Sequence, residues 1–418
     1  MSAASSAARP PWFPALVEPH VRLYLFGQTV SMLGSWVLDI TLSLLVWQLT
    51  KSPALLGLLN FLIYVPGIVV TPLFSAQLTA VNARRRTLWV LTAALLVALT
   101  LTVLMALNWL TMPVILVLAA LRGVLNGMEV PSRQMLLASS VKEPERIASA
   151  VALSTVSFHA ARMCGPAIAG VFFGTAGALW GFGLAVAALL VMLGCVWYLP
   201  RTPAPRPAAA SVGRGGLAGA LDFVRGDRFS RLFLPVTICV GLFAGAYQTL
   251  VPVLADRVFG DTAHWTAGFF AAVGLGGLAA ALLLSTHLMP AALRRLLVVV
   301  PWFIALAFLG IGLSRQPWLV LLCFGMVGFG MSFVGTCTNA EMQQRVPSEV
   351  RGGLIALFLM SFVGAIPISQ LLAGLLAQSL TVQGSFLVLA VVLFVGLLLL
   401  FMPRWWALGR LELNAEKI

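Results

Sequence analysis

Three ionisable side chains in this sequence could carry protons, and each lies within a long apolar stretch. They are Asp39, Glu129 and His159. An ionisable group at the centre of a bilayer costs at least about 2.5–3.5 kcal/mol on insertion scales, so its presence indicates a function or a fixed partner. A carboxyl group that is alone in apolar surroundings can bind and release protons, whereas one that meets an arginine stays ionised. The sequence leaves Asp39 and Glu129 level as proton sites.

Glu129 belongs to a stripe of polar residues. Arg122, Asn126, Glu129 and Arg133 follow one another at steps of four, three and four, which places them on one helical face. One interpretation is a stripe that lines a central cavity, with Glu129 as proton site and Arg122 as its partner or as an anion contact. The alternative is an ion-paired stripe that only fixes helix packing. We expect Arg133, which follows Pro131, to lie at the interface and reach lipid phosphates.

A second polar cluster lies about thirty residues further on. His159 and Arg162 are spaced i, i+3. Histidine changes its protonation near neutral pH, so His159 is a candidate for proton transfer, although a buried histidine is often a structural hydrogen-bonding group. Arg162 could bind an anionic group of a substrate or an intramembrane carboxylate.

The remaining polar candidates are uncharged. Gln28, Ser35 and Asp39 share one helical face, and the second half of the chain offers Tyr247, Gln248 and Asn339. We therefore predict the following substrate-binding residues: Gln28, Arg122, Asn126, Arg162, Tyr247, Gln248 and Asn339.

The elements that must position these residues are membrane-spanning helices. Hydrophobic residues make up 60% of the chain, charged residues 9%, and the mean hydropathy is +1.00. A spanning helix needs roughly 20 apolar residues, and the sequence contains twelve such stretches. The predicted spans are 23–48, 54–79, 87–107, 113–138, 148–173, 178–199, 231–255, 264–286, 295–314, 317–338, 352–377 and 383–402. The seventh is interrupted by Pro252.

The net charge of +13 is explained by membrane topology. With a cytoplasmic N-terminus, twenty of the 26 Lys and Arg residues lie in cytoplasmic segments, against only Lys51, Arg257 and Arg315 on the other side. This bias predicts that both termini are cytoplasmic. Basicity then serves orientation and attraction to anionic membrane lipids, and no nucleic-acid partner is needed.

The sequence lacks the motifs of disulfide-rich proteins, metal sites and common enzymes. The five cysteines all lie in apolar stretches without CxxC spacing, so we expect no disulfide framework, no metal and no cofactor. The sequence has no nucleophile elbow, no HExxH and no P-loop, which argues against an enzyme and against ATP-driven transport by this chain alone.

A linker rich in proline, alanine and glycine divides the chain in two. The halves carry similar loops, VKEPERIASAVAL and VPSEVRGGLIAL, whose arginines are Arg146 and Arg351. Such a repeat predicts a transporter with its substrate site between the halves. The expected organisation is an N-tail (1–22), a six-helix bundle (23–199), a linker (200–230), a second six-helix bundle (231–402) and a C-tail (403–418).

Several motifs resemble the major facilitator superfamily, and in particular its bacterial branch of enterobactin exporters and macrolide-efflux pumps. They are FGQTVSMLGSWVLDITLSLLVWQLTKSPALLGL, LRGVLNGMEVPSRQMLLASSV, ARMCGPAIAG and QQRVPSEVRGGL. The resemblance implies an all-α fold of twelve transmembrane helices in two six-helix bundles. It assigns gating roles to Arg84, Arg85, Arg86, Gly165, Pro166 and Arg351.

The chain departs from the family pattern at its second loop. Ala80 replaces an aspartate that latches the two halves in relatives, so that latch is missing or has moved to another group such as Asn82. In the later loop Gly353 replaces a second arginine.

We therefore expect a proton-coupled exporter of a small amphiphilic anion such as a siderophore, working as a monomer in the bacterial inner membrane. The alternatives are a multidrug pump, a lysophospholipid or lipid flippase, a proton-coupled importer, and a membrane sensor that does not transport.

Overall fold

The computed structural model describes residues 14–200, 216–285, 290–347 and 350–415, and this part of the chain is helical throughout. Twelve of its helical segments are long and apolar enough to cross a membrane, which confirms the twelve predicted spans. The bounds in the first half are α1 Pro19–Thr50, α2 Pro53–Ser75, α3 Ala80–Ala106, α4 Met112–Ser140, α5 Ile147–Ala176 and α6 Ala178–Tyr198. In the second half they are α7 Gly216–Gly226, α8 Arg228–Ala244, α9 Tyr247–Phe259, α10 Thr262–Ser285, α11 Pro290–Leu313, α12 Pro317–Arg345, α13 Arg351–Ser379 and α14 Val382–Ala415.

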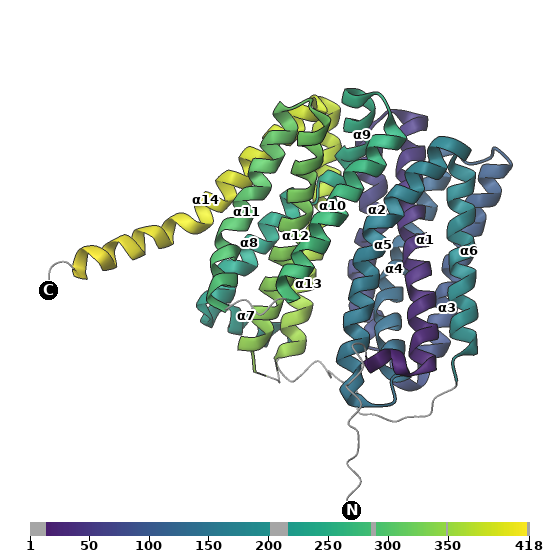
Figure 1. Ribbon diagram of the computed structural model, residues 1–418, viewed down its shortest axis with the longest axis horizontal. Helices are drawn as coiled ribbons and strands as arrows, with labels where there is room; N and C mark the ends of the chain where they lie inside the picture. Colours follow the sequence, from purple (N-terminus) through teal and green to yellow (C-terminus); the bar gives the residue numbers. More distant parts are fainter. Residues whose placement is uncertain (1–13, 201–215, 286–289, 348–349, 416–418) are drawn as a thin grey trace, which may run out of the picture.

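The helices form two bundles with the same packing pattern (Figure 1). In the first, α1 packs on α5 and α6, α2 on α4, and α3 on α4 and α6. In the second, α8 packs on α13 and α14, α10 on α12, and α11 on α12 and α14. The correspondence holds helix by helix, so the two halves are structural repeats of one another.

The seventh span is a broken helix. α8 ends at Ala244 and α9 begins at Tyr247, so the break lies at Gly245–Ala246, several residues before the Pro252 that the sequence suggested. The break places Tyr247 at the first residue of a new helix. Discontinuous spans of this kind surround the substrate sites of many transporters.

The segments predicted as the linker and the C-tail contain helices. Part of the predicted linker, residues 201–215, lies outside the described residues, but its amphipathic end forms α7. Helix α14 continues past Met402 into the predicted C-tail and ends at Ala415.

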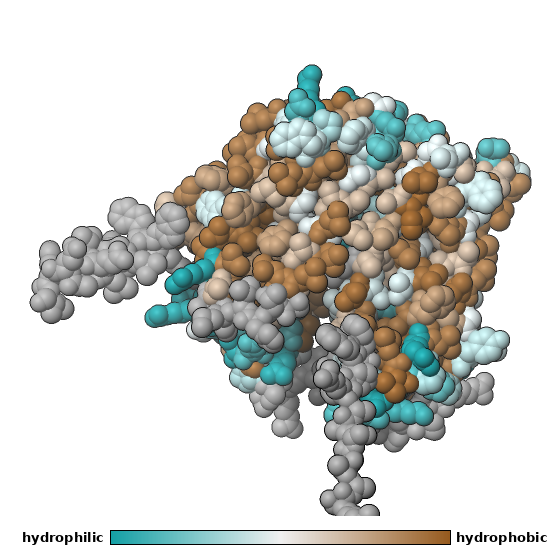
Figure 2. All heavy atoms as spheres, in the orientation of Figure 1, coloured by the Kyte–Doolittle hydropathy of each residue, from teal (hydrophilic) through white to brown (hydrophobic). Residues whose placement is uncertain are grey.

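Apolar side chains cover the middle of the molecule and polar ones gather toward its two ends (Figure 2). Because the hydrocarbon core of a bilayer is about 30 Å thick, this belt is the surface that the acyl chains cover. Exposed leucines, valines and tryptophans are therefore the normal lipid-facing surface of this protein.

The bundles meet along two helix pairs, α2 with α13 and α5 with α10. Gly57 and Gly374 allow the first contact, because a Cβ on Gly57 would lie 2.7 Å from the Gln370 carbonyl oxygen and 3.1 Å from the Gly374 Cα. In the second contact, a Cβ on Gly274 would lie 2.5 Å from the Met163 Cα. Small residues thus let the two halves approach at backbone distance.

Candidate functional site

An ion pair between Asp39 and Arg122 lies inside the first bundle. Arg122 Nε donates to Asp39 Oδ1 at 2.7 Å, and the two side chains are 4% and 13% exposed. Arg122 Nη2 also approaches the Ser35 carbonyl oxygen at 3.5 Å. The pair joins α1 to α4, so the polar face that carries Asp39 and the polar stripe that carries Arg122 form one site. Of the two fates weighed for Asp39, the structure therefore gives it an arginine partner.

Glu129 forms a second buried pair, with Arg133 one turn further along α4. Arg133 Nη2 donates to Ser31 Oγ at 2.6 Å, and Tyr24 on α1 donates to the Arg133 carbonyl oxygen at 2.8 Å. The prediction that Arg133 reaches the lipid interface is wrong, because its side chain is 7% exposed and held inside the bundle. Glu129 and Arg122 are about 10 Å apart along the helix axis. They do not pair with each other, because each forms an ion pair with a different residue.

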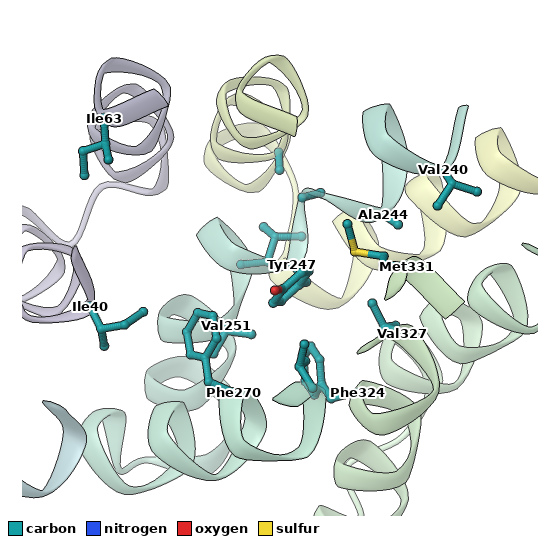
Figure 3. Packing of buried hydrophobic residues seen from close by; sticks show 14 of the residues in the cluster. Ile40, Ile63, Val240, Ala244, Tyr247, Val251, Phe270, Phe324, Val327 and Met331 are labelled. Carbon is teal, nitrogen blue, oxygen red and sulfur yellow. The ribbon is translucent and has the colours of Figure 1, made fainter. Parts of the chain in front are cut away.

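Arg162 connects the two halves. Its Nη2 donates to the Tyr247 hydroxyl at 2.8 Å, and Gln248 Nε2 donates to the same oxygen at 3.3 Å. Gln370 on α13 extends the chain by donating to Gln248 Oε1. Figure 3 shows Tyr247 among apolar side chains of the second bundle, and Ile40 and Ile63 on helices of the first bundle at the left of the view.

In the described part of the chain, no carboxylate lies within ion-pair distance of Arg162. Its Nε is buried and has no hydrogen-bond partner there. The other two intramembrane arginines, Arg122 and Arg133, each have a carboxylate. Arg162 is thus a cation with donors left over, at the junction of the bundles.

Gly165 and Trp36 set the position of Arg162. A Cβ on Gly165 would lie 2.4 Å from the Trp36 Cβ, so only glycine lets α5 approach α1 here. The Trp36 ring in turn lies 5.9 Å from the guanidinium of Arg162, a distance at which a cation is attracted to an aromatic face. Pro166, which follows Gly165, is buried inside α5.

Helix α2 adds two polar side chains that sequence reasoning missed. The Tyr64 hydroxyl lies within electrostatic range of Asp39, Arg122 and Arg162. Asn60, one turn earlier, donates to Thr249 Oγ1 on α9 at 3.2 Å. Both are polar residues in an apolar span at i, i+4 spacing, which is the signal that could have found them.

The other predicted substrate residues lie apart from Arg162. Gln28 is 2% exposed and donates to Ser154 Oγ between α1 and α5. Asn126 donates to the Ile63 carbonyl oxygen at 3.4 Å, and Asn339 accepts from Gln343 on α12 at 3.0 Å. His159 belongs to α5, but its side chain lies outside the described residues.

The predicted gating residues occupy different surroundings. Arg84 donates to the Val196 and Trp197 carbonyl oxygens at 3.2 and 2.7 Å, so it binds the end of α6 within its own half. Arg351 is exposed at the first residue of α13. Asn82 is occupied by capping α3 together with Thr79. Arg85 and Arg86 face the outer surface of α3, beside Trp89.

Besides the Arg162–Tyr247 and Asn60–Thr249 contacts, two polar contacts join the halves at one end of the molecule. Lys51 Nζ lies 2.8 Å from Asp256 Oδ2, and Ser52 Oγ donates to Gln378 Oε1 at 3.2 Å. Both pairs join the turn between α1 and α2 to the last residues of α9 and α13, and these helix ends lie opposite the N-terminus in Figure 1. At the other end, where the basic loops lie, no ion pair or hydrogen bond joins the halves among the residues that the structure describes.

Twelve spans in two repeated bundles, with buried ion pairs and a polar junction between the halves, define a major facilitator fold and a secondary transporter rather than an enzyme. The family model described as transmembrane secretion effector, of the major facilitator superfamily, matches residues 11–416, and the chain belongs to this family.

Two named relatives transport small molecules. The chain is 24% identical to the staphyloferrin A transporter of Staphylococcus aureus over 374 residues, which cover 88% of this chain and 92% of that protein. It is also 24% identical to the multidrug efflux pump Tap of Mycolicibacterium fortuitum over 252 residues, covering 59% of this chain and 61% of Tap.

Solved structures support the fold. The nucleoside transporter NupG superimposes with a TM-score of 0.75 at 12% identity, covering 92% of this chain and 99% of NupG. The human organic anion transporter MFSD10 superimposes with a TM-score of 0.61 at 17% identity, covering 92% and 100% of the two chains.

Proposed function

We propose that this protein exports a small amphiphilic anion, such as a siderophore, from the bacterial cytoplasm in exchange for protons. The observation that carries the proposal is Arg162, a cation without a carboxylate partner in the described part of the chain, held by Tyr247 at the junction of the halves. A substrate carboxylate would complete its hydrogen bonds, because a guanidinium binds carboxylates in a bidentate manner. The likeness to a transporter of the siderophore staphyloferrin A supports this substrate class.

Of the three candidate proton sites, His159 has a side chain outside the described residues, and we favour Asp39 over Glu129. Its partner Arg122 lies near Tyr64, whose hydroxyl is also in range of Arg162, so the pair and the proposed anion contact share one polar region. Proton binding to Asp39 would release Arg122 from its pair and change the charge beside the substrate. Glu129 and Arg133 form a separate cluster with Ser31 and serve helix packing in this scheme.

Alternating access follows from the two repeated bundles. The bonded end of the molecule carries Lys51 and Asp256, and the basic loops lie at the opposite end. In this proposal the basic loops lie in the cytoplasm, and the contacts at the opposite end close the outward side. The anion would enter from the cytoplasm, bind at Arg162 and leave after the bundles rock.

A multidrug pump is the second candidate. It is favoured by the likeness to Tap and by the apolar, aromatic surroundings of Tyr247. Neutral or cationic drugs would use these apolar surfaces, whereas the unpaired Arg162 favours an anion. Loss of the Arg162 charge should therefore impair transport by an anion exporter and not by a multidrug pump.

Proteoliposomes with an acidified lumen and a lumenal pH dye test the proposal. Addition of carboxylate siderophores, macrolides or lysolipids to the bath should raise the lumenal pH for siderophores only, because inward substrate movement drives protons out. Asp39→Asn should abolish the rise in lumenal pH. Glu129→Gln should retain this response when it is normalised to the amount of folded protein. Glu341→Gln is the matched control, since Glu341 is also paired with an arginine one turn away.

Two outcomes would contradict the proposal. A response to macrolides alone would favour the multidrug pump. A siderophore response that survives Asp39→Asn but is lost in Glu129→Gln would move proton coupling to Glu129.

A further inference from the structure

The start of α3, on the predicted cytoplasmic side, carries two arginines that form no ion pair among the residues that the structure describes. Arg85 is exposed and Arg86 is half-buried. Arg86 Nη2 donates to Gln77 Oε1 at 3.3 Å, and its guanidinium lies 5.2 Å from the Phe74 ring. Neither arginine has an ion pair in the described part of the chain. The family's loop aspartate would supply a negative charge nearby, but Ala80 stands in its place.

These arginines line a hollow on the outer surface of the first bundle. A cavity of about 410 Å³ is bordered by Asn82, Arg85, Arg86 and Trp89. The amide of Asn82 is occupied, because it caps α3 and bonds the Gln77 carbonyl oxygen at 3.0 Å. The charged donors at this hollow are the two guanidinium groups, and they suit an anion with several oxygen atoms.

An apolar groove continues from the same place. A second cavity of about 200 Å³ shares Arg86 and Trp89 with the first, and its other lining residues are Phe74, Val90, Ala93, Leu125 and Met128. Ala93 lies seven residues beyond Arg86, roughly 10 Å deeper along the helix. The hollow thus has a cationic entrance and an apolar floor that runs toward the membrane centre.

This surface faces lipid rather than the second bundle. Helix α3 packs on α4 and α6 of its own half. Trp89 is 68% exposed, which is typical of a tryptophan at the boundary between headgroups and acyl chains. A water-soluble anion would use the arginines alone and leave the groove empty, whereas a lipid would fill both.

We propose that the hollow at Arg85 and Arg86 is a binding site for an anionic phospholipid. The phosphate accepts hydrogen bonds from the two guanidinium groups, and one acyl chain lies along Phe74, Val90 and Met128. Because none of the described residues that line the hollow is a carboxylate, a headgroup ammonium finds no counter-charge among them. The site therefore selects phosphatidylglycerol or cardiolipin over zwitterionic lipids. This inference does not depend on the transported substrate.

Native mass spectrometry of the purified full-length protein with phosphatidylglycerol tests the site. The Arg85→Gln/Arg86→Gln variant should bind the first phosphatidylglycerol about thirtyfold more weakly, since each cation near an anionic lipid contributes about fivefold. The matched control is Arg294→Gln/Arg295→Gln, which removes two exposed charges at the start of α11 on the same side. This control should change the affinity less than twofold.

Three further measurements keep the test decisive. Arg85→Lys/Arg86→Lys should retain most of the affinity, which separates loss of charge from misfolding. Brominated phosphatidylglycerol at low mole fraction should quench the fluorescence that Trp89→Phe removes, and brominated phosphatidylcholine should not. Equal losses in both Gln variants, or displacement of the lipid by inorganic phosphate with no acyl-chain quenching, would overturn the proposal.

Discussion

At the scale of single residues, the intramembrane charges differ in whether they have partners. Arg122 is neutralised by Asp39 and Arg133 by Glu129, while Arg162 has only the neutral Tyr247 and the ring of Trp36 in the described part of the chain. A buried pair is worth little compared with apolar packing, but breaking it leaves an uncompensated charge. Arg122 and Arg133 are therefore compensated where they lie, whereas Arg162 has donors left for an anion.

The Asp39–Arg122 pair should respond asymmetrically to neutralisation. Asp39→Asn leaves a buried arginine that cannot lose its charge, whereas Arg122→Gln leaves a carboxyl that can bind a proton. We expect Asp39→Asn to destabilise the protein by about 3–5 kcal/mol and Arg122→Gln by clearly less. The double variant should recover most of the loss.

Thermal unfolding in detergent over a range of pH measures this asymmetry. Arg122→Gln should lose less stability at low pH than at neutral pH, because the orphaned carboxyl then binds a proton. Equal destabilisation by both single variants at every pH would show that the pair does not act as the geometry indicates.

At the scale of elements, the close contact of α2 with α13 depends on glycine. A Cβ on Gly57 meets backbone atoms of α13, which cannot move aside as a flexible side chain would. We expect Gly57→Ala to push the two helices apart at the end that Ser52 and Gln378 join.

Cross-linking through cysteines placed at Ser52 and Gln378 reports this separation. Gly57→Ala should lower the yield several-fold. Gly194→Ala is the control, since a Cβ there meets nothing within 4 Å. Unchanged yields in both variants would mean that the helices absorb the methyl group without separating.

At the scale of the whole molecule, the halves are linked at one end and at the junction. Lys51 and Asp256 form the ion pair at the closed end, where Trp47 lies beneath Lys51 and Arg257 at 5.4 and 5.5 Å. Because Lys51 is 56% exposed, we assign this pair no more than about 1 kcal/mol. In the proposed transport cycle the pair would bias the closed state only weakly, which suits an end that opens in every turnover.

Asp256→Asn should therefore raise the open population by up to about fivefold. The exchanged pair Lys51→Asp/Asp256→Lys should restore it, and high salt should reduce the difference between wild type and variant. Hydrogen exchange at the adjoining ends of α1 and α9 measures opening. If the faster hydrogen exchange of Asp256→Asn also occurs in the exchanged pair, loss of the ion pair is not its cause.

The twelve spans and two bundles could be predicted from the sequence because a membrane span requires an unbroken apolar run. The sequence allowed Asp39 to pair with Arg122, with Arg162 or with neither, and it could not decide among these because Asp39 and Arg122 are 83 residues apart and meet only when α1 crosses α4. The error at Arg133 has the same cause, because Ser31 and Tyr24 on α1 hold it inside. Tyr64 and Asn60 are uncharged residues in an otherwise apolar span, and nothing in the sequence places them beside Arg122 or α9.

The most direct test of the account compares a carboxylate substrate with its neutral methyl ester, in binding to wild type, Arg162→Lys, Arg162→Gln and Tyr247→Phe. Arg162→Gln should weaken carboxylate binding by about 10- to 100-fold, as for a lost hydrogen bond to a charged group, and leave ester binding unchanged. Arg162→Lys should keep part of the preference for the carboxylate over the ester. Tyr247→Phe should still bind the carboxylate more tightly than the ester. An Arg162→Gln protein that still prefers the carboxylate over the ester would contradict the assignment of Arg162 as the anion contact.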